Sequence, residues 1–128
     1  MLHMPKPLLV LFAVAYAGTF ASFTAVVIDR VPTHRPLHGT SRCVCGQPVR
    51  WRHNIPGVSW LMLRGRAACC GAPIPVWLWV LEASTMVLVG TTAWWSPAVA
   101  AAIGLVWLTA TAQVGIARRR RARVPLQR

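Results

Sequence analysis

Three long runs of hydrophobic residues occupy most of the chain, at residues 8–28, 76–95 and 98–116. Glu82 is the only charged residue within them. At 1.5 Å per residue, a helical run of this length reaches about 30 Å, which matches the hydrocarbon core of a bilayer. The Ser96-Pro97 link between the second and third runs suits a helical hairpin, because proline is favoured at the start of a helix. The pattern predicts an all-α membrane protein with three transmembrane helices.

Polar segments around these runs complete a division into four regions. Residues 1–28 contain the N-terminal segment and the first transmembrane helix, and residues 29–75 form a basic loop that contains the cysteines. Residues 76–117 form the helical hairpin, and residues 118–128 form a basic tail.

Charge is distributed unevenly among these regions. The 128 residues include 14 Lys and Arg but only 2 acids, for a net charge of +12, whereas 55% of the chain is hydrophobic. This composition excludes a disordered chain, and the length excludes a large soluble enzyme. The loop and the tail hold all the arginines, and only Lys6 precedes the first run. Because positive residues favour the cytoplasmic side, we expect the loop and the C-terminus in the cytoplasm and the N-terminus outside.

The first run also fits a cleavable signal peptide. Lys6, the apolar run and Ala15-Tyr16-Ala17 before Gly18 match that template. Cleavage would export the arginine-rich loop, against the charge rule, so we favour a transmembrane helix.

Small residues recur at four-residue spacing within the first run. Ala17, Ala21 and Ala25 form one series, and Gly18 and Ser22 form a second. Such series let membrane helices approach closely, so they predict helix packing rather than chemistry.

The loop carries all four cysteines of the chain in two clusters, each followed by a glycine. They are Cys43, Cys45, Cys69 and Cys70. A reducing cytoplasm disfavours disulfides, so four thiolates at two points of the loop indicate a tetrahedral zinc site. The spacing departs from two C-x-x-C pairs, and two alternatives stay open. Three thiolates could bind with His53 or His38 as fourth ligand, or the cysteines could merely pack.

Basic and aromatic residues alternate between the cysteine clusters. Residues 54–57 have the composition of a turn, and Ser59 is a candidate cap for a short helix. We expect Trp51 and Trp60 to anchor this element at the membrane surface. The same pattern occurs in nucleic-acid-binding proteins, but a positive loop is expected of this topology, so no nucleic-acid partner is predicted.

An ordered series of short motifs runs from the first helix through the loop. It comprises Ala21-Ser22-Phe23, Val26-Val27-Ile28, Arg30, Pro32, Ser41-Arg42-Cys43, Cys45-Gly46, Pro48, Arg50-Trp51, Asn54-Ile55-Pro56, Ser59-Trp60-Leu61, Leu63-Arg64-Gly65-Arg66, Cys70-Gly71 and Pro73-Ile74. The series resembles the N-terminal domain of the type IV prepilin leader peptidases of the A24 type, which are bifunctional peptidase/N-methyltransferases of bacterial membranes. Glu82 falls where that family carries a glutamate.

The resemblance implies a multi-pass protein of the bacterial inner membrane that takes part in type IV pilus or type II secretion biogenesis. It also implies that the loop residues of the family pattern form a functional set, namely Arg50, Trp51, Asn54, Pro56, Arg64, Gly65 and Arg66. The first cysteine pair is one residue short of the family pattern, and Ala67 replaces a family cysteine. Ala25 and His53 replace its usual Asn and Asp. S-adenosylmethionine is therefore not expected as a cofactor.

The family's peptidases cleave with two aspartates, one of them in a G-x-G-D motif that this sequence lacks. Asp29 and Glu82 are not expected to replace that pair, because Asp29 falls at the edge of a predicted helix and Glu82 lies within one. We expect Asp29 to be an interfacial charge. We expect Glu82 to be an in-membrane group paired with a loop arginine or a partner helix.

The leading hypothesis is a stand-alone N-terminal domain that is not proteolytic by itself. Its partners would be the lipid bilayer, a separately encoded A24-type catalytic subunit and prepilins. The alternatives are a small membrane adaptor, a degenerate remnant, or an N-methyltransferase of processed pilins.

Overall fold

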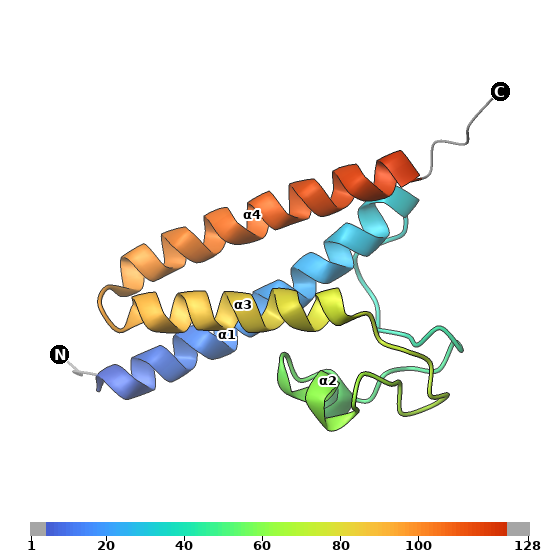
Figure 1. The fold of residues 1–128 in the computed structure, drawn as a ribbon, viewed down its shortest axis with the longest axis horizontal. Helices are drawn as coiled ribbons and strands as arrows, with labels where there is room; N and C mark the ends of the chain where they lie inside the picture. Colours follow the sequence, from blue (N-terminus) through green and yellow to red (C-terminus); the bar gives the residue numbers. More distant parts are fainter. Residues whose placement is uncertain (1–4, 123–128) are drawn as a thin grey trace.

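A computed structural model describes residues 5–122 of the chain. Its elements are α1 (Lys6–Arg30), the 3₁₀ turns η1 (Val31–Thr33) and η2 (Trp51–His53), α2 (Val58–Met62), α3 (Val76–Ala93) and α4 (Pro97–Ala122). The described part has no β-strand, only two isolated bridges. Figure 1 shows α1, α3 and α4 side by side, with the loop that contains α2 near the end of the bundle where α1 ends and α3 begins.

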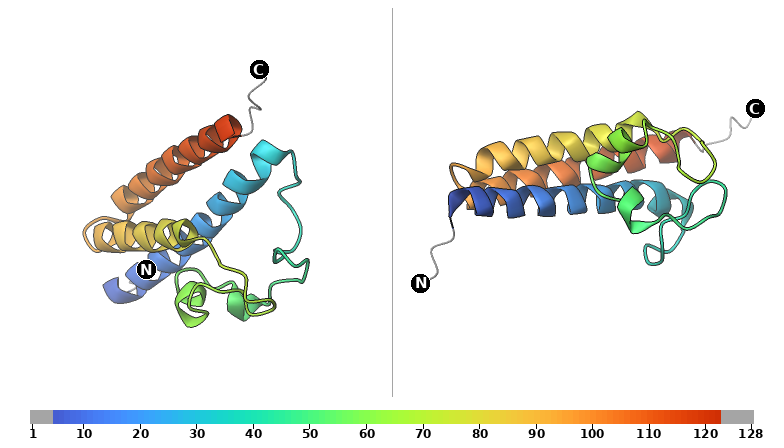
Figure 2. Two further views of the ribbon diagram at one scale, coloured as in Figure 1. Left: turned by 45° about the vertical axis from the view of Figure 1, so that its right-hand side comes forward. Right: turned by 90° about the horizontal axis from the view of Figure 1, so that it is seen from below.

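The three long helices are long and apolar enough to cross a membrane. This confirms the predicted all-α fold with three candidate spans and a loop that bears the cysteines after the first of them. The hairpin link is also as expected, because α3 ends at Ala93 and α4 begins at Pro97. Both views in Figure 2 also show the loop near one end of the bundle.

The first part of the predicted basic tail is helical. The tail was expected from residue 118, and α4 continues through its first residues to Ala122, because arginine and alanine both favour helix. Arg119 on this extension forms an ion pair with Asp29 at the end of α1, with 2.7 Å between the charged atoms. Arg35 binds the other carboxylate oxygen of Asp29 at 2.7 Å. The remainder of the predicted tail, residues 123–128, lies outside the described residues.

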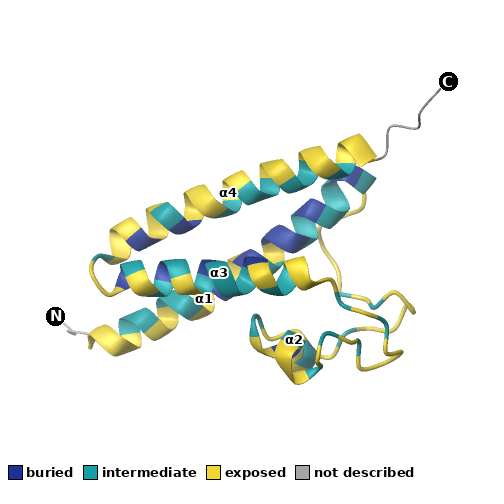
Figure 3. Cartoon of the chain, in the orientation of Figure 1, coloured by how far each residue is buried: buried dark blue, intermediate teal, exposed yellow. Residues whose placement is uncertain are grey.

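Small residues of α1 form the centre of the bundle, as their spacing predicted. Ala21 is fully buried, and Ala17 and Ala25 are each 7% exposed. Ala17 packs with residues of α3 and α4, and Ala21 and Ala25 pack with Leu81 of α3. Figure 3 shows the buried residues on the facing sides of the helices and the exposed ones on the outside. The apolar outer surface is what a lipid environment requires of spanning helices.

Gly18 allows the loop to approach α1 closely. A Cβ atom at this position would lie 2.9 Å from Cβ of Pro56 and 3.2 Å from the sulfur of Met86. Pro56 belongs to the loop and Met86 to α3, so three segments meet at Gly18.

We therefore expect Gly18→Ala to lower the free energy of unfolding by about 1–3 kcal/mol, because the proline ring is rigid and cannot move aside. Unfolding of the purified protein in mixed micelles, followed by circular dichroism, measures the change. Thr19→Ala is the matched control, since Thr19 is exposed on the same helix. Equal stability of the two variants would show that the loop does not touch α1 here.

Candidate functional site

Two short turns present the four cysteines. In the first knuckle loop, residues 42–48, an isolated bridge pairs Arg42 with Pro48. The amide of Cys43 donates to the carbonyl of Gln47 at 2.9 Å, and the amide of Gly46 donates back to Cys43 at 2.8 Å. Gly46 has φ of 85°, a conformation that glycine adopts without strain.

The second knuckle loop, residues 66–73, repeats this architecture with one more residue. Its bridge pairs Arg66 with Pro73, and the amide of Ala67 donates to Ala72 at 2.8 Å. Gly71 has φ of 69°, and its amide donates to Ala67 at 2.8 Å. Ala67 therefore takes the backbone position that Cys43 has in the first loop.

In each knuckle loop, the arginine at the first position donates to the carbonyl of the loop's glycine. The guanidinium of Arg42 donates to the carbonyl of Gly46 at 3.1 Å, and that of Arg66 donates to Gly71 at 3.4 Å. The two loops are thus similar units that face each other. Of the family-pattern residues, Arg66 has a defined role here, which is to support the second knuckle loop.

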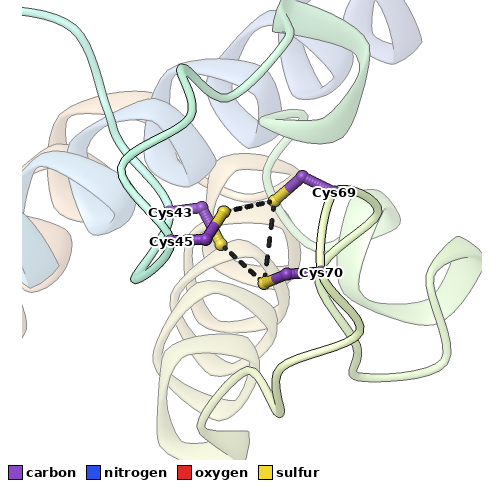
Figure 4. A group of neighbouring side chains, drawn as sticks. All are labelled: Cys43, Cys45, Cys69 and Cys70. Atoms are coloured by element: carbon purple, nitrogen blue, oxygen red, sulfur yellow. Dashed lines mark hydrogen bonds between the residues drawn. The ribbon is translucent and has the colours of Figure 1, made fainter.

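The four sulfur atoms converge between the two knuckle loops, as Figure 4 shows. The Sγ atoms of Cys43 and Cys70 are 3.5 Å apart, and those of Cys45 and Cys69 are 3.3 Å apart. All four lie within 4.8 Å of one another. Four sulfurs at about 2.3 Å from a central zinc ion would be about 3.8 Å apart, so the observed set fits a tetrahedral site with little movement.

The four cysteines form a candidate metal site without a histidine ligand. The candidate metal group among the described residues consists of four cysteines and includes neither His38 nor His53. The four thiols thus already provide the coordination number of a structural site. The cluster could hold a metal ion, and the ligand set predicted from the sequence is brought together in space.

The thiols differ in their readiness to ionise. The pKa of Cys43 falls to about 7, first because of the Cys45 backbone amide and then because of the Cys69 and Cys70 thiols. Hydrogen bonding to Cys43 and Cys45 raises the pKa of Cys69 to about 12. The Ala72 amide favours the thiolate of Cys70, but hydrogen bonding to Cys43 and Cys45 and desolvation of the thiolate outweigh it and raise the pKa of Cys70. Cys43 thus ionises more readily than Cys69 and Cys70, whose protons a metal must displace.

Glu82 forms a second polar cluster, inside the helical bundle. Its carboxylate accepts hydrogen bonds from the hydroxyl of Ser22 on α1 and from the amide of Gly57 in the loop, the latter at 2.6 Å. The indole of Trp79 donates to the carbonyl of Gly57 at 3.0 Å. The peptide groups on both sides of Gly57 are therefore held by α3.

Glu82 was predicted to pair with a loop arginine or a partner helix, and no arginine among the described residues forms a salt bridge with it. Within residues 5–122 the salt bridges all involve Asp29. Arg42 and Arg66 of the loop donate to backbone carbonyls, and Glu82 accepts from a serine hydroxyl and a backbone amide. From the sequence, Ser22 was expected to serve helix packing and was part of the family-like motif Ala21-Ser22-Phe23, and no local pattern could have connected it with residues 57 and 82.

The remaining family-pattern residues lie in the middle of the loop. Arg50 and Asn54 flank η2, and Pro56 contacts α1. Arg64 and Gly65 both have positive φ, and Gly65 lies against the ring of Trp60.

Two expectations for the loop need correction. Trp60 is turned inward, stacks on Trp79 with 5.6 Å between ring centroids and donates to Ile74, whereas Trp51 is 77% exposed. Ser59 does not cap α2. The helix begins after Gly57, and the Ser59 hydroxyl accepts from the amide of Ile55 and donates to Arg52.

A cavity of about 1180 Å³ opens between α1, α3 and the loop. Both acids of the chain line it, together with Cys43, His53 and Arg119. Each acid is engaged by its own partners, Asp29 by two arginines and Glu82 by Ser22 and Gly57. The cavity therefore brings the two carboxylates to one surface without forming the shared-proton pair that aspartic peptidases use.

Comparison with known proteins gives consistent matches. The family described as Bacterial Peptidase A24 N-terminal domain matches residues 16–96. Several similar proteins are each named prepilin leader peptidase/N-methyltransferase. That of Myxococcus xanthus is 43% identical over 72 residues, covering 55% of this chain and 22% of the relative. That of Klebsiella pneumoniae is 41% identical over 63 residues, covering 43% and 28%. That of Dichelobacter nodosus is 31% identical over 114 residues, covering 66% and 40%.

The matched part of this chain thus spans between about a fifth and two fifths of the length of these relatives, from 22% to 40%. No solved structure is similar enough to the chain to count as a match.

Proposed function

The chain belongs to the family of bacterial peptidase A24 N-terminal domains, and from this premise we propose that it is a non-proteolytic membrane component of prepilin processing. The catalytic aspartates come from a separately encoded A24-type subunit. The observation that carries this proposal is that the chain has two carboxylic side chains, Asp29 and Glu82, and both are held by structural contacts. Neither is available to activate a water molecule.

The protein is a multi-pass membrane protein of this family, and the charge distribution supports one orientation. Seven arginines lie in residues 29–75 and six in residues 118–128, while Lys6, the first residue of α1, is the one Lys or Arg before these regions. By the positive-inside rule, the loop and the C-terminus face the cytoplasm of a bacterial cell, and the N-terminus lies on the far side of the inner membrane.

The four-cysteine cluster holds zinc in this proposal. A reducing cytoplasm keeps the thiols available, and four sulfurs without an open position suit a structural rather than a catalytic metal. Cys43, Cys45, Cys69 and Cys70 would bind the ion, which would fix the two knuckle loops against each other. The zinc supplies no step of a reaction.

Prepilins and the catalytic subunit are the proposed partners. Support comes from the names of the relatives, which describe enzymes of prepilin leader cleavage and N-methylation. The region of similarity covers the loop and the first two long helices. The G-x-G-D motif does not occur in this sequence, so a partner would supply it.

Co-expression tests this proposal directly. The chain is produced in a peptidase-deficient bacterium with a candidate catalytic subunit that carries G-x-G-D and with a prepilin. We expect prepilin cleavage and co-purification of the catalytic subunit when the chain is present. The control replaces the aspartate of that motif by asparagine, which must abolish cleavage but keep co-purification. Equal cleavage and no co-purification with and without this chain would contradict the proposal.

A further inference from the structure

The middle of the loop has an unusual charge pattern for a segment in water. Residues 54–63 contain no charged side chain and no histidine, although arginines occur on both sides of them. Arg52 and His53 precede the stretch, and Arg64 follows it. An apolar stretch of about ten residues is too short to span a bilayer but long enough to enter it and return.

Contacts with α3 place the tip of this stretch beside the second and third turns of that helix, away from the end of the bundle. Gly57 donates its amide to Glu82, which lies about 9 Å along α3 from the start of the helix at Val76. A Cβ atom at Gly57 would be 3.2 Å from the sulfur of Met86, about 15 Å from the same start. Half of the hydrocarbon core is also about 15 Å, so the turn at residues 54–57 reaches towards the middle of a membrane that α3 spans.

Contacts with α1 give an independent measure of the same depth. Pro56 meets Gly18, which lies about 18 Å back from the end of α1 at Arg30. Figure 1 agrees with both measures, because α2 lies beside the bundle at the level of the first turns of α3 rather than beyond the end of the helices.

Four backbone groups of the turn, those of Ile55 and Gly57, are paired within the protein, as backbone groups at this depth must be. Glu82 accepts the amide of Gly57, and Trp79 donates to its carbonyl. The Ser59 hydroxyl accepts the amide of Ile55 at 2.7 Å, and the amide of Ser59 donates to the carbonyl of Ile55 at 3.0 Å.

In α2, polar and apolar side chains are exposed in the opposite way to those of a helix at a water surface. Its serine, Ser59, is 8% exposed, whereas Val58, Leu61 and Met62 are 46%, 56% and 70% exposed. A helix that lies on a protein in water places its apolar side chains inward and its serine outward. Apolar side chains that face outward at membrane depth indicate a lipid contact.

We propose that residues 54–63 form a re-entrant element that dips into the bilayer and returns on the same side. Val58, Leu61 and Met62 contact lipid acyl chains, and their surface continues the apolar outer surface of α1 and α3. Glu82, Ser22 and Trp79 hold the tip of the element in place. The two knuckle loops lie outside the membrane, so only part of the predicted 29–75 region is an aqueous domain.

Site-specific photocrosslinking in native membranes tests this element. Met62 is replaced by p-benzoylphenylalanine in the full chain, and lipid adducts are measured by mass spectrometry after irradiation. Phe20 on α1, 56% exposed, is the positive control, and Val44 in the first knuckle loop, 88% exposed, is the negative one. Leu61 provides a second position if the Met62 variant is poorly produced.

We expect adducts with acyl chains at Met62 and Phe20 in similar yield, and at least about tenfold less at Val44, because acyl chains are excluded from water. A yield at Met62 and Leu61 as low as that at Val44, while Phe20 still reacts with lipid, would overturn the proposal. Crosslinks from Met62 to a protein instead of lipid would overturn it as well.

Discussion

Removing zinc from the four-cysteine cluster is expected to unfold both knuckle loops while α1, α3 and α4 remain helical. Three of the four cysteines are exposed, and each knuckle loop has few backbone hydrogen bonds of its own. Segments this small depend on their metal for folding. The helices pack through separate apolar clusters that include no loop residue, so the bundle does not need the ion.

Hydrogen exchange with and without a zinc chelator measures this effect on the purified protein. We expect amides that are protected in the zinc-loaded protein, such as those of Cys43, Ala67 and Gly71, to exchange at least about 100-fold faster after chelation. Amides of α3 should keep their protection. The variant Cys45→Ser should show the fast exchange without chelator, and Val44→Ser should not.

Two results would contradict this account. Metal analysis of the purified protein could find no zinc, or the exchange of residues 42–48 and 66–73 could be the same with and without chelator. In either case the knuckle loops would be stabilised by their own turns and by the two arginines that bridge them.

The sequence predicted the helices well because their signal is local. Long apolar runs must be helical in a membrane, and the packing role of Ala17, Ala21 and Ala25 follows from their spacing alone. The change from apolar to basic residues near residue 118 marks an expected membrane boundary, not a helix boundary, so it does not predict where α4 ends. Arginine continues a helix easily, and the ion pair of Arg119 with Asp29 gives the extension a tertiary contact.

The cysteine cluster was predicted in composition but not in geometry. A C-x-C pair and a vicinal pair look unsuited to a common metal, since adjacent cysteines point in different directions along a chain. The structure resolves this through the length of the second knuckle loop. Its extra residue brings both Cys69 and Cys70 towards the first loop, where they meet Cys45 and Cys43.

The polar cluster at Glu82 could not have been predicted from the sequence. Its members come from α1, the loop and α3, and no periodicity relates residues 22, 57 and 82. The rule that an in-membrane carboxylate needs a partner was correct, and a loop arginine or a partner helix was expected to provide it, whereas Ser22 of α1 and the amide of Gly57 do so. A backbone amide carries no signal in the sequence, and only the three-dimensional course of the loop brings Gly57 to the carboxylate.

Glu82→Ala is expected to lower the free energy of unfolding by about 3 kcal/mol, because it removes two hydrogen bonds to a carboxylate and leaves their donors unpaired inside the bundle. Glu82→Gln should cost less, since its amide oxygen can still accept one of the two bonds. Tryptophan fluorescence during unfolding in mixed micelles measures both variants, and Trp79, one of the seven tryptophans that contribute, contacts Gly57.

The comparison with Asp29→Asn separates this role from a general effect of charge. Asp29 is the other acid of the chain, and its two ion pairs are exposed, so they are worth about 0–1 kcal/mol each. A double-mutant cycle then identifies the partner. Ser22→Ala should destabilise the natural chain but cost almost nothing in the Glu82→Ala background, because the hydroxyl has already lost its acceptor. Additive effects of the two substitutions, or equal losses for Glu82→Ala and Asp29→Asn, would mean that Glu82 does not hold the loop against α1 and α3.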